Sequence, residues 1–357
     1  WHCTMLMILA PRQYMMLLIR RFSSRWKVAM LLIISTGVSN GGGMYGLRIL
    51  RKSNYMHWVK KQYQRIRYAI NLTTTRMCLA IHSVKGYTTR NKYILGDKSR
   101  RTNKDCVNIH YWRSAAGEEN LGDYLSKVIC NYYAAYWKLP QKLPPTRFRH
   151  LYAVGSIIGF SYQNAVVWGS GLLNEYKPYI DAARKSHLDI RCVRGPKTSS
   201  VLLNAGIPCP SVYGDPAVLM PLIFSPDKCK KRHRVSVIRH YMDTAGIMED
   251  RRNPCVHSIR IQTTDYRNVI SEIAQSERVI SSSLHGLILS EAYGVPAVYL
   301  RTGDMFKFED YYYSTGRYDI KYVSSVQEGM HCDTMKVPDL REMQRTLIES
   351  FPRDIWT

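Results

Sequence analysis

The first 100 residues of the chain almost lack acidic side chains. They hold 18 lysines and arginines and a single acid, Asp97, which gives them a net charge of +17. The remaining residues hold 33 basic and 26 acidic side chains, a net charge of only +7. The strong basicity of the 357-residue chain, +24 in all, therefore belongs to a leader and not to the region that follows it.

The leader also lacks an apolar run of transmembrane length. Its apolar stretch, residues 28–38, follows several basic residues and has the length of a signal-peptide core. A basic and aromatic stretch, residues 60–68, suits an anionic membrane surface or nucleic acid, and equally a solvated helix face. Many arginines with few acids are also typical of organelle transit sequences. We expect residues 1–105 to be a membrane-associated or targeting leader.

Motifs that would indicate a metal, a redox centre or a bound nucleotide are missing. The nine cysteines are scattered without a Cys-x-x-Cys pair or a Cys/His cluster at zinc spacing, which fits reduced thiols in the cytosol. The glycine run at 41–43 is not followed by Gly-Lys-Ser/Thr, so a flexible linker is the simpler interpretation. Heptads, short repeats and low-complexity tracts are also missing. We expect neither a metal nor a cofactor.

Beyond residue 105 the apolar pattern alternates between strands and helices. Short β-rich runs occur at 107–112, 151–154, 165–168 and 188–193, and again at 234–239, 256–261 and 278–282 after a proline-containing linker at 225–228. Helical spacing lies between them, for example at 121–137 and 266–275. This order predicts an α/β protein with two doubly wound Rossmann-like domains facing a cleft. Their expected bounds are 106–225 and 232–357, the second with a C-terminal helix.

Residues 278–300 are predicted to form a strand, a tight polar turn, a short helix from Leu284 and a second strand. His285 falls at the start of that helix, where free N–H groups and the helix dipole favour anions. Ser282 and Ser283 occupy the same turn, as hydrogen-bond donors or as simple helix caps. A lone histidine is most often structural, but this one lies where open α/β sheets bind ligands.

Other strand ends and helix starts carry candidate ligand contacts. Arg194 follows the strand at 188–193, where a guanidinium group suits a carboxylate or a phosphate, with a surface salt bridge as the alternative. Asp123 opens a helix, either as a cap or as a residue of the cleft. Gly169 and Ser170 end a strand, and their small size lets a ligand or a neighbouring backbone approach closely.

Five stretches, in order along the chain, resemble the polysaccharide pyruvyl transferase family. They are Asn-Leu-Gly-Asp at 120–123, Gly-Ser at 155–156 with Gly-Ser-Gly at 169–171, Arg-Gly-Pro-Lys-Thr at 194–198, Tyr-Gly-Asp-Pro-Ala at 213–217, and the unit at 278–300 with its Leu-His-Gly and Gly-Val-Pro. The segments at 306–312 and 350–356 are also similar. The resemblance covers about residues 107–356. It implies an arrangement similar to the glycosyltransferase B fold and transfer of pyruvate from phosphoenolpyruvate to a sugar as a ketal.

The implied donor has a carboxylate and a phosphate, so its site needs a cation for each and a proton donor for the methylene carbon. His285 is the expected catalytic acid, because imidazole titrates nearest neutral pH. The expected substrate contacts are Arg194, Ser282, Ser283, Leu284, Asn120, Asp123, Gly169, Ser170 and Lys307. In the family the residue two before this histidine is often arginine, whereas here it is Ser283. Lys307, Arg301 or Arg239 is therefore expected to supply the missing charge.

The expected partners are phosphoenolpyruvate and a sugar or lipid-linked oligosaccharide acceptor, with peripheral contact to an anionic membrane. We do not favour nucleic acid as a partner, although the basic leader leaves that interpretation open. The expected location is the cytoplasm, at the inner face of the membrane, with Golgi or organelle targeting as the alternative. A nucleotide-sugar glycosyltransferase on the same scaffold is the alternative function, since fold does not determine function.

Overall fold

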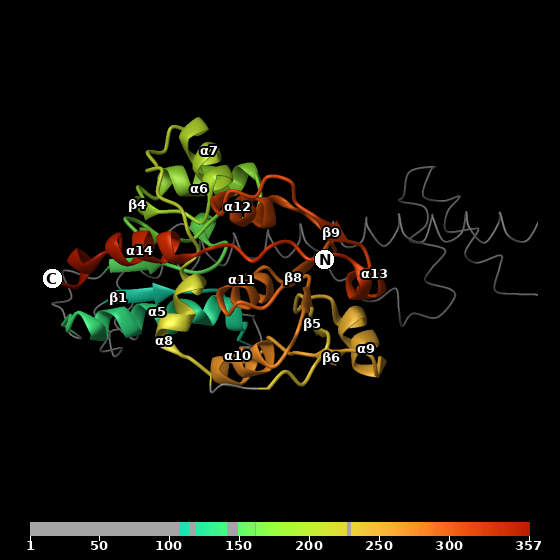
Figure 1. The fold of residues 1–357 in the computed structure, drawn as a ribbon. Coiled ribbons are helices and arrows are strands. Elements are labelled where there is room, and N and C mark those ends of the chain that lie inside the picture. Colours follow the sequence, from blue (N-terminus) through green and yellow to red (C-terminus); the bar gives the residue numbers. More distant parts are fainter. Residues whose placement is uncertain (1–106, 114–118, 141–148, 161, 227–229) are drawn as a thin grey trace, which may run out of the picture. The chain divides into compact units, whose positions relative to one another are not determined.

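The computed structural model describes residues 107–113, 119–140, 149–160, 162–226 and 230–357 (Figure 1). The described residues belong to one compact unit of the chain. The predicted leader and residues 227 and 228 of the predicted linker lie outside them. Below, the first half means residues 107–226 and the second half means residues 230–357.

The first half contains a parallel sheet with the strand order β1-β2-β3-β4. Its strands are β1 (Val107–His110), β2 (Arg149–Tyr152), β3 (Val166–Trp168) and β4 (Asp189–Cys192). Its helices are α5 (Leu121–Tyr136), η3 (Ile158–Phe160), α6 (Lys177–Lys185), α7 (Pro196–Asn204), η4 (Pro216–Leu219) and α8 (Met220–Ile223). Every residue of β3 is buried, as expected for a central strand of a parallel sheet with both faces covered.

The second half contains a parallel sheet with the strand order β6-β5-β7-β8-β9. Its strands are β5 (Ser236–Ile238), β6 (His257–Ser258), β7 (Val279–Ser281), β8 (Ala297–Leu300) and β9 (Tyr322–Val323). Its helices are α9 (Thr244–Arg252), α10 (Tyr266–Ala274), α11 (Leu284–Ala292), α12 (Phe306–Ser314), α13 (Val326–His331), α14 (Arg341–Glu349) and η5 (Arg353–Trp356).

The two sheets differ in their winding. After β5 the chain adds β6 on one side and then returns to add β7 on the other side, so the strand order reverses at β5. The described strands of the first sheet follow one another in chain order without such a reversal. The prediction of an α/β fold with parallel sheets is confirmed, and a doubly wound order is seen in the second sheet only.

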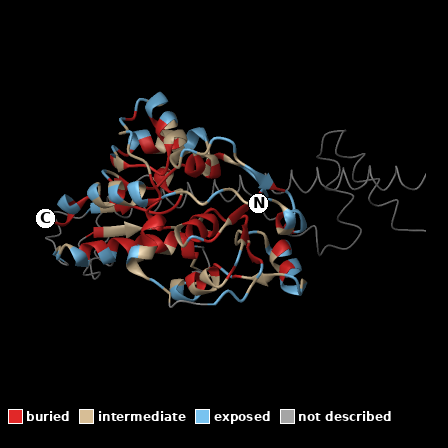
Figure 2. Cartoon of the chain, viewed as in Figure 1, coloured by how far each residue is buried: buried red, intermediate tan, exposed pale blue. Residues whose placement is uncertain are grey.

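Buried side chains join the two halves in one hydrophobic cluster that includes Leu125, Trp168, Ile238 and Leu287. Figure 2 shows buried positions along the strands and on the inner sides of the helices. The helix α14 returns to the first half, where the indole Nε1 of Trp168 donates a hydrogen bond of 3.0 Å to the carbonyl oxygen of Leu347. The second half thus contributes packing to the first.

In the described part of the chain, no helix combines the length and the apolar character that a membrane crossing requires. The five cysteines among the described residues are free thiols. The membrane contact expected of the leader concerns residues outside this part and stays a prediction.

Candidate active site

The candidate site lies at the carboxyl ends of β5 and β7, where the strand order of the second sheet reverses. Hydrogen bonds join the loops that follow these two strands. The backbone N–H of His240 donates to Ser282 Oγ over 2.9 Å, and the N–H of Ser282 donates to the carbonyl oxygen of Ile238 over 3.1 Å. Ser281 Oγ also donates to the Ile238 carbonyl. A strand-order reversal is where open α/β sheets bind ligands, so these loops define the place for a site.

His285 is the second residue of α11 and lies two residues after the N-cap residue, Ser283. Its ring packs against Gly122 at the start of α5, so closely that a Cβ at position 122 would lie 1.9 Å from Nδ1. Any larger residue there would displace the imidazole. The Nε2 atom of His285 is buried and has no hydrogen-bond partner, and it lies 3.6 Å from Oδ2 of Asp215.

Asp215 is fully buried and precedes η4. Its Oδ1 accepts a hydrogen bond of 3.0 Å from the N–H of Ala217, while its Oδ2 has no partner. The unpaired Oδ2 therefore faces the unpaired Nε2 of His285 at a distance too long for a hydrogen bond. Buried polar atoms without partners are uncommon in native structures, and they often mark catalytic groups.

Asp123 adds a second buried carboxylate from the first turn of α5. Its Oδ2 accepts a hydrogen bond of 2.5 Å from Asn120 Nδ2. Gly155 leaves room for this carboxylate, since a Cβ at that position would lie 2.6 Å from Asp123 Oδ1. Burial raises the pKa of Asp123, and the nearby Asp215 carboxylate acts in the same direction, against the charges of His285 and Lys307.

Lys307, in the first turn of α12, brings a cation to the same cluster. Burial and the neighbouring charge of Arg194 lower the pKa of Lys307 to about 8, opposed by Asp123 and Asp304. Its Nζ lies 5.3 Å from the centroid of the Phe308 ring. Burial lowers the pKa of His240 to about 3, with Lys307 and His285 adding to the effect, so that imidazole is neutral at pH 7.

Arg194 is brought to the vicinity of the cluster but is fully buried. Its Nε donates to Asp310 Oδ2 over 3.0 Å, one terminal nitrogen to Ser156 Oγ over 2.8 Å, and the other to the Leu172 carbonyl over 2.6 Å. Gly171 covers the planar face, since a Cβ there would lie 2.5 Å from Cζ. The predicted role of Arg194 as a direct clamp on a donor anion does not fit this geometry. Its partner Asp310 lies on α12, which local sequence could not reveal.

The remaining predicted contacts are mostly buried and hold loops together. Ser170 Oγ donates to the Gly155 carbonyl over 2.8 Å. Gly169 has a φ of +91° and lies where a Cβ would come within 2.3 Å of Pro216 Cδ, so only glycine fits there. The side chains of Ser282, Ser283 and Leu284 are buried at the N-terminus of α11. Of the residues predicted from sequence, Asn120, Asp123, His285 and Lys307 gather in one cluster; their contact with a substrate stays a prediction.

The cluster also contains residues that sequence reasoning did not single out, Asp215 and His240. His240 lies two residues after β5, and Asp215 lies two residues after Tyr213, which forms an isolated parallel bridge with Val193. Asp215 also stands in the Tyr-Gly-Asp-Pro-Ala stretch, so a search of strand ends could have found both. The other two proposed cations are placed elsewhere. Arg239 is paired with Asp243 and Asp250, and Arg301 donates a hydrogen bond of 2.9 Å to the hydroxyl of Tyr322.

Among the described residues no group of three or more histidine, cysteine or acidic side chains is placed to hold a metal ion. The cluster instead combines buried carboxylates, an imidazole with a free nitrogen and an ammonium group. Such a set can bind an anion through Lys307 and the N-terminus of α11 and can transfer protons beside it.

The profile of the family "Polysaccharide pyruvyl transferase" matches residues 117–304, more than half of the chain. The chain belongs to this family, which confirms the resemblance drawn from sequence and makes the protein a polysaccharide pyruvyl transferase enzyme. Membership implies a polysaccharide acceptor.

The chain is also similar to individual proteins. Uncharacterized protein L143 of Acanthamoeba polyphaga mimivirus is 32% identical over 226 residues, which cover 60% of this chain and 76% of that protein. Succinoglycan biosynthesis protein ExoV of Rhizobium meliloti (strain 1021) is 27% identical over 220 residues, which cover 58% of this chain and 64% of ExoV. The crystal structure of an uncharacterized Klebsiella pneumoniae protein superposes with a TM-score of 0.42 and 13% identity, covering 67% of this chain and 98% of that one.

Proposed function

We propose that this enzyme transfers pyruvate from phosphoenolpyruvate to two hydroxyls of one sugar in a polysaccharide or its precursor, as a cyclic ketal. The observation that carries the proposal is the buried, unpartnered pair of His285 Nε2 and Asp215 Oδ2, 3.6 Å apart. Asp123 and Lys307 lie beside this pair. Acid and base groups next to a cation are what the reaction needs.

The reaction moves protons at three places. The methylene carbon of the donor gains a proton and becomes a methyl group. Carbon 2 forms two bonds to sugar oxygens, while its bond to the phosphate oxygen breaks. One hydroxyl proton balances the new methyl group, and the other leaves with the phosphate as hydrogen phosphate. Both acid and base catalysis are therefore required, and each positioned group contributes roughly two to four powers of ten in rate.

The cluster offers a residue for each task. His285 is the proposed acid toward the methylene carbon, with the Asp215 carboxylate 3.6 Å from its Nε2. Asp123 is the proposed base toward a sugar hydroxyl, since a raised pKa makes a carboxylate a stronger base. Lys307 and the N–H groups at the start of α11 bind the donor anions. The donor itself is the only small molecule in the proposal, with no cofactor and no metal.

The proposal extends to architecture and location. The two sheets would be the centres of domains 106–225 and 232–357, facing each other as in glycosyltransferase B enzymes. A site built from side chains of both halves supports that arrangement. A cytoplasmic location, with the basic leader against an anionic membrane, would bring the enzyme to a lipid-linked acceptor.

The decisive experiment supplies the purified full chain with phosphoenolpyruvate and a panel of pyruvate-free saccharides. The panel begins with acid-depyruvylated succinoglycan units, since the relative ExoV is named for succinoglycan biosynthesis. We expect acceptor-dependent release of phosphate and a new ketal methyl signal in proton NMR. Reactions without acceptor are the control for donor hydrolysis. Sugar transfer from a nucleotide sugar, with no phosphate release from phosphoenolpyruvate, would favour a glycosyltransferase instead.

A further inference from the structure

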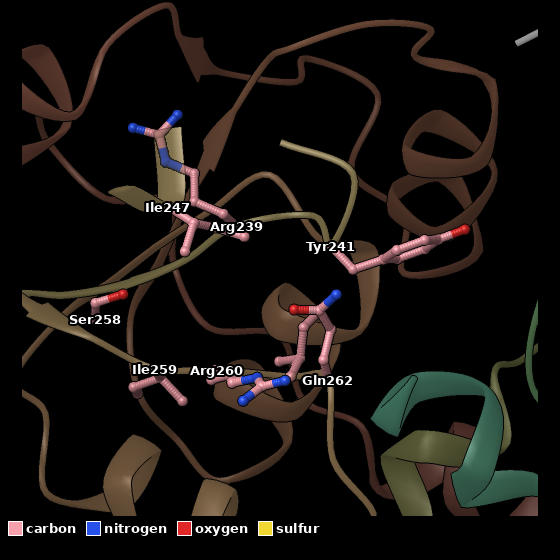
Figure 3. Close-up of a pocket in the computed structure, with 8 residues that line it drawn as sticks. Arg239, Tyr241, Ile247, Ser258, Ile259, Arg260 and Gln262 are labelled. Carbon is pink, nitrogen blue, oxygen red and sulfur yellow. The ribbon is translucent and has the colours of Figure 1, made fainter. Parts of the chain in front are cut away.

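A shallow pocket opens at the carboxyl ends of β5 and β6 (Figure 3). It is lined by Arg239 and Tyr241 after β5, by Ile247 of α9, and by Ser258, Ile259, Arg260, Ile261 and Gln262 at the end of β6. Its enclosed volume is about 10 Å³, room for about one water molecule. A ligand here would rest against the surface, because small-molecule pockets are usually hundreds of Å³ in volume.

The pocket wall touches the catalytic cluster. The carbonyl oxygen of Ile261 accepts a hydrogen bond of 2.8 Å from the N–H of Leu121. The next residue along the chain, Gly122, packs against the imidazole of His285. On its other side the pocket is bounded by Tyr241, which directly follows His240 of the cluster. The pocket wall is thus joined to the proposed acid through two adjacent residues, Leu121 and Gly122.

An aromatic surface borders the same pocket. The ring of Tyr241 lies 5.0 Å from that of Trp112 and 4.6 Å from that of His240, measured between centroids. Trp112 and Tyr241 are both partly exposed, and Trp112 belongs to the first half of the chain. Flat aromatic rings offer a large rigid apolar area, with a polar tip on tyrosine. The C–H face of a pyranose ring is complementary to such an area.

Polar side chains with suitable chemistry stand at the edge of the pocket. Arg260 is exposed and makes no ion pair with the described residues, unlike Arg239, which is held by Asp243 and Asp250. Gln262 carries both an amide donor and a carbonyl acceptor. Sugar hydroxyls need donors and acceptors at the ring edge, and Arg260 and Gln262 provide them beside the aromatic area.

We infer that Trp112, Tyr241, Arg260 and Gln262 form the acceptor subsite, which binds a pyranose ring of the acceptor saccharide. The subsite takes its name from the proposed function, but saccharide binding by these residues is measurable without turnover. The open, shallow shape suits a polysaccharide chain lying along the surface. It suits a nucleotide less well, because a nucleobase and its phosphates usually occupy an enclosed pocket.

The test measures binding of a pyruvate-free oligosaccharide to the full chain by calorimetry, with no donor present. We expect Tyr241→Ala to weaken binding about tenfold, from loss of ring stacking, and Gln262→Ala to weaken it severalfold. Tyr318→Ala is the matched control, since Tyr318 is 70% exposed and does not line the pocket. In turnover assays the two pocket variants should raise KM for the acceptor and leave KM for phosphoenolpyruvate unchanged.

The outcomes separate the subsite from the reaction. If oligosaccharide binding depends on Tyr241 and Gln262 but the protein does not transfer pyruvate, the subsite is supported and the proposed function is wrong. If both pocket variants bind the acceptor with wild-type affinity, the subsite inference is wrong and the proposed function is unaffected. The inference would also be overturned if the two substitutions weakened the binding of a nucleoside diphosphate and left the affinity for the oligosaccharide unchanged. Gln262→Ala serves if Tyr241→Ala fails to fold, because it removes only a partly exposed side chain.

Discussion

The two halves of the molecule bring opposite chemistry to the site. The first half contributes the carboxylates of Asp123 and Asp215, whereas the second half contributes His285, His240 and Lys307. Within this cluster, neither half alone supplies both the carboxylates and the nitrogen bases. The comparison shows why the site is assembled where the second sheet reverses its strand order, with the start of α5 and the loop before η4 packed against it.

A second pair of charged side chains joins the halves with the opposite arrangement of charge. Here the first half supplies the cation, Arg194, and the second half supplies the anion, Asp310, with both side chains fully buried. All the bonding groups of this pair are satisfied within the protein, whereas Nε2 of His285 and Oδ2 of Asp215 are not. We conclude that Arg194 and Asp310 hold the halves together. The unsatisfied pair is the one to which the proposed function assigns the chemistry.

The largest expected effect comes from removing the imidazole of the unsatisfied pair. His285→Ala should lower kcat by about two to four powers of ten and change KM for phosphoenolpyruvate little, because it removes proton transfer and not donor binding. Steady-state kinetics with phosphate release as the readout provide the measurement. His331→Ala, which alters an exposed histidine of α13, is the control. Normal turnover in folded His285→Ala protein would end its assignment as the acid.

Removing one member of the buried Arg194–Asp310 pair should lower the stability of the protein. Arg194→Ala leaves the buried Asp310 carboxylate without its cation and should cost about 3–5 kcal/mol in the free energy of unfolding. Arg191→Ala, in the strand β4 just before Arg194, is a matched control, because its ion pairs with Asp189 and Asp354 are exposed and worth at most about 1 kcal/mol. Denaturant titration compares the two. If the Arg194→Ala protein were stable but bound phosphoenolpyruvate more weakly, the sequence-based prediction that Arg194 contacts the donor would be supported instead.

The sequence predicted the unit around His285 closely, since β7, α11 and β8 lie within two residues of the expected bounds. Valine and isoleucine in the strands, and Gly294 with Pro296 after the helix, are strong local signals. The role of Arg194 could not be predicted. Its carboxylate partner is 116 residues away in the chain, and nothing near either residue signals the pairing. Local patterns thus placed the elements, while long-range packing decided which charges remain free.

Lys307 allows a smaller test of the charge that the second half brings to the site. Its pKa, lowered to about 8 by burial, means that the folded protein loses this proton above about pH 8. If the ammonium binds a donor anion, KM for phosphoenolpyruvate should rise about fivefold from pH 8 to pH 9. Lys307→Arg keeps its charge over this range and should flatten the rise. The same pH dependence in Lys307→Arg and wild type would assign it to another group.

Asp123 gives the smallest expected effect on stability, and it separates function from stability. Burial raises its pKa above 3.8, so the folded state holds this proton more tightly than the unfolded state does. Stability therefore falls as pH rises from the unfolded pKa of 3.8 through the raised folded pKa. Asp123→Asn keeps the shape without the charge and should raise Tm by about 2–4 °C at pH 7, while turnover falls.

The advantage of Asp123→Asn should shrink as the pH is lowered below 3.8, because the wild-type carboxyl then becomes protonated in both states. Thermal melts of both proteins at several pH values measure it. Asp319→Asn, at an exposed acid, should show no such trend. A variant that gains no stability at pH 7 would mean that the charges of His285 and Lys307 fully offset the burial of Asp123. The carboxylate of the first half would then be stabilised by the cations of the second half, with no strain held at the site.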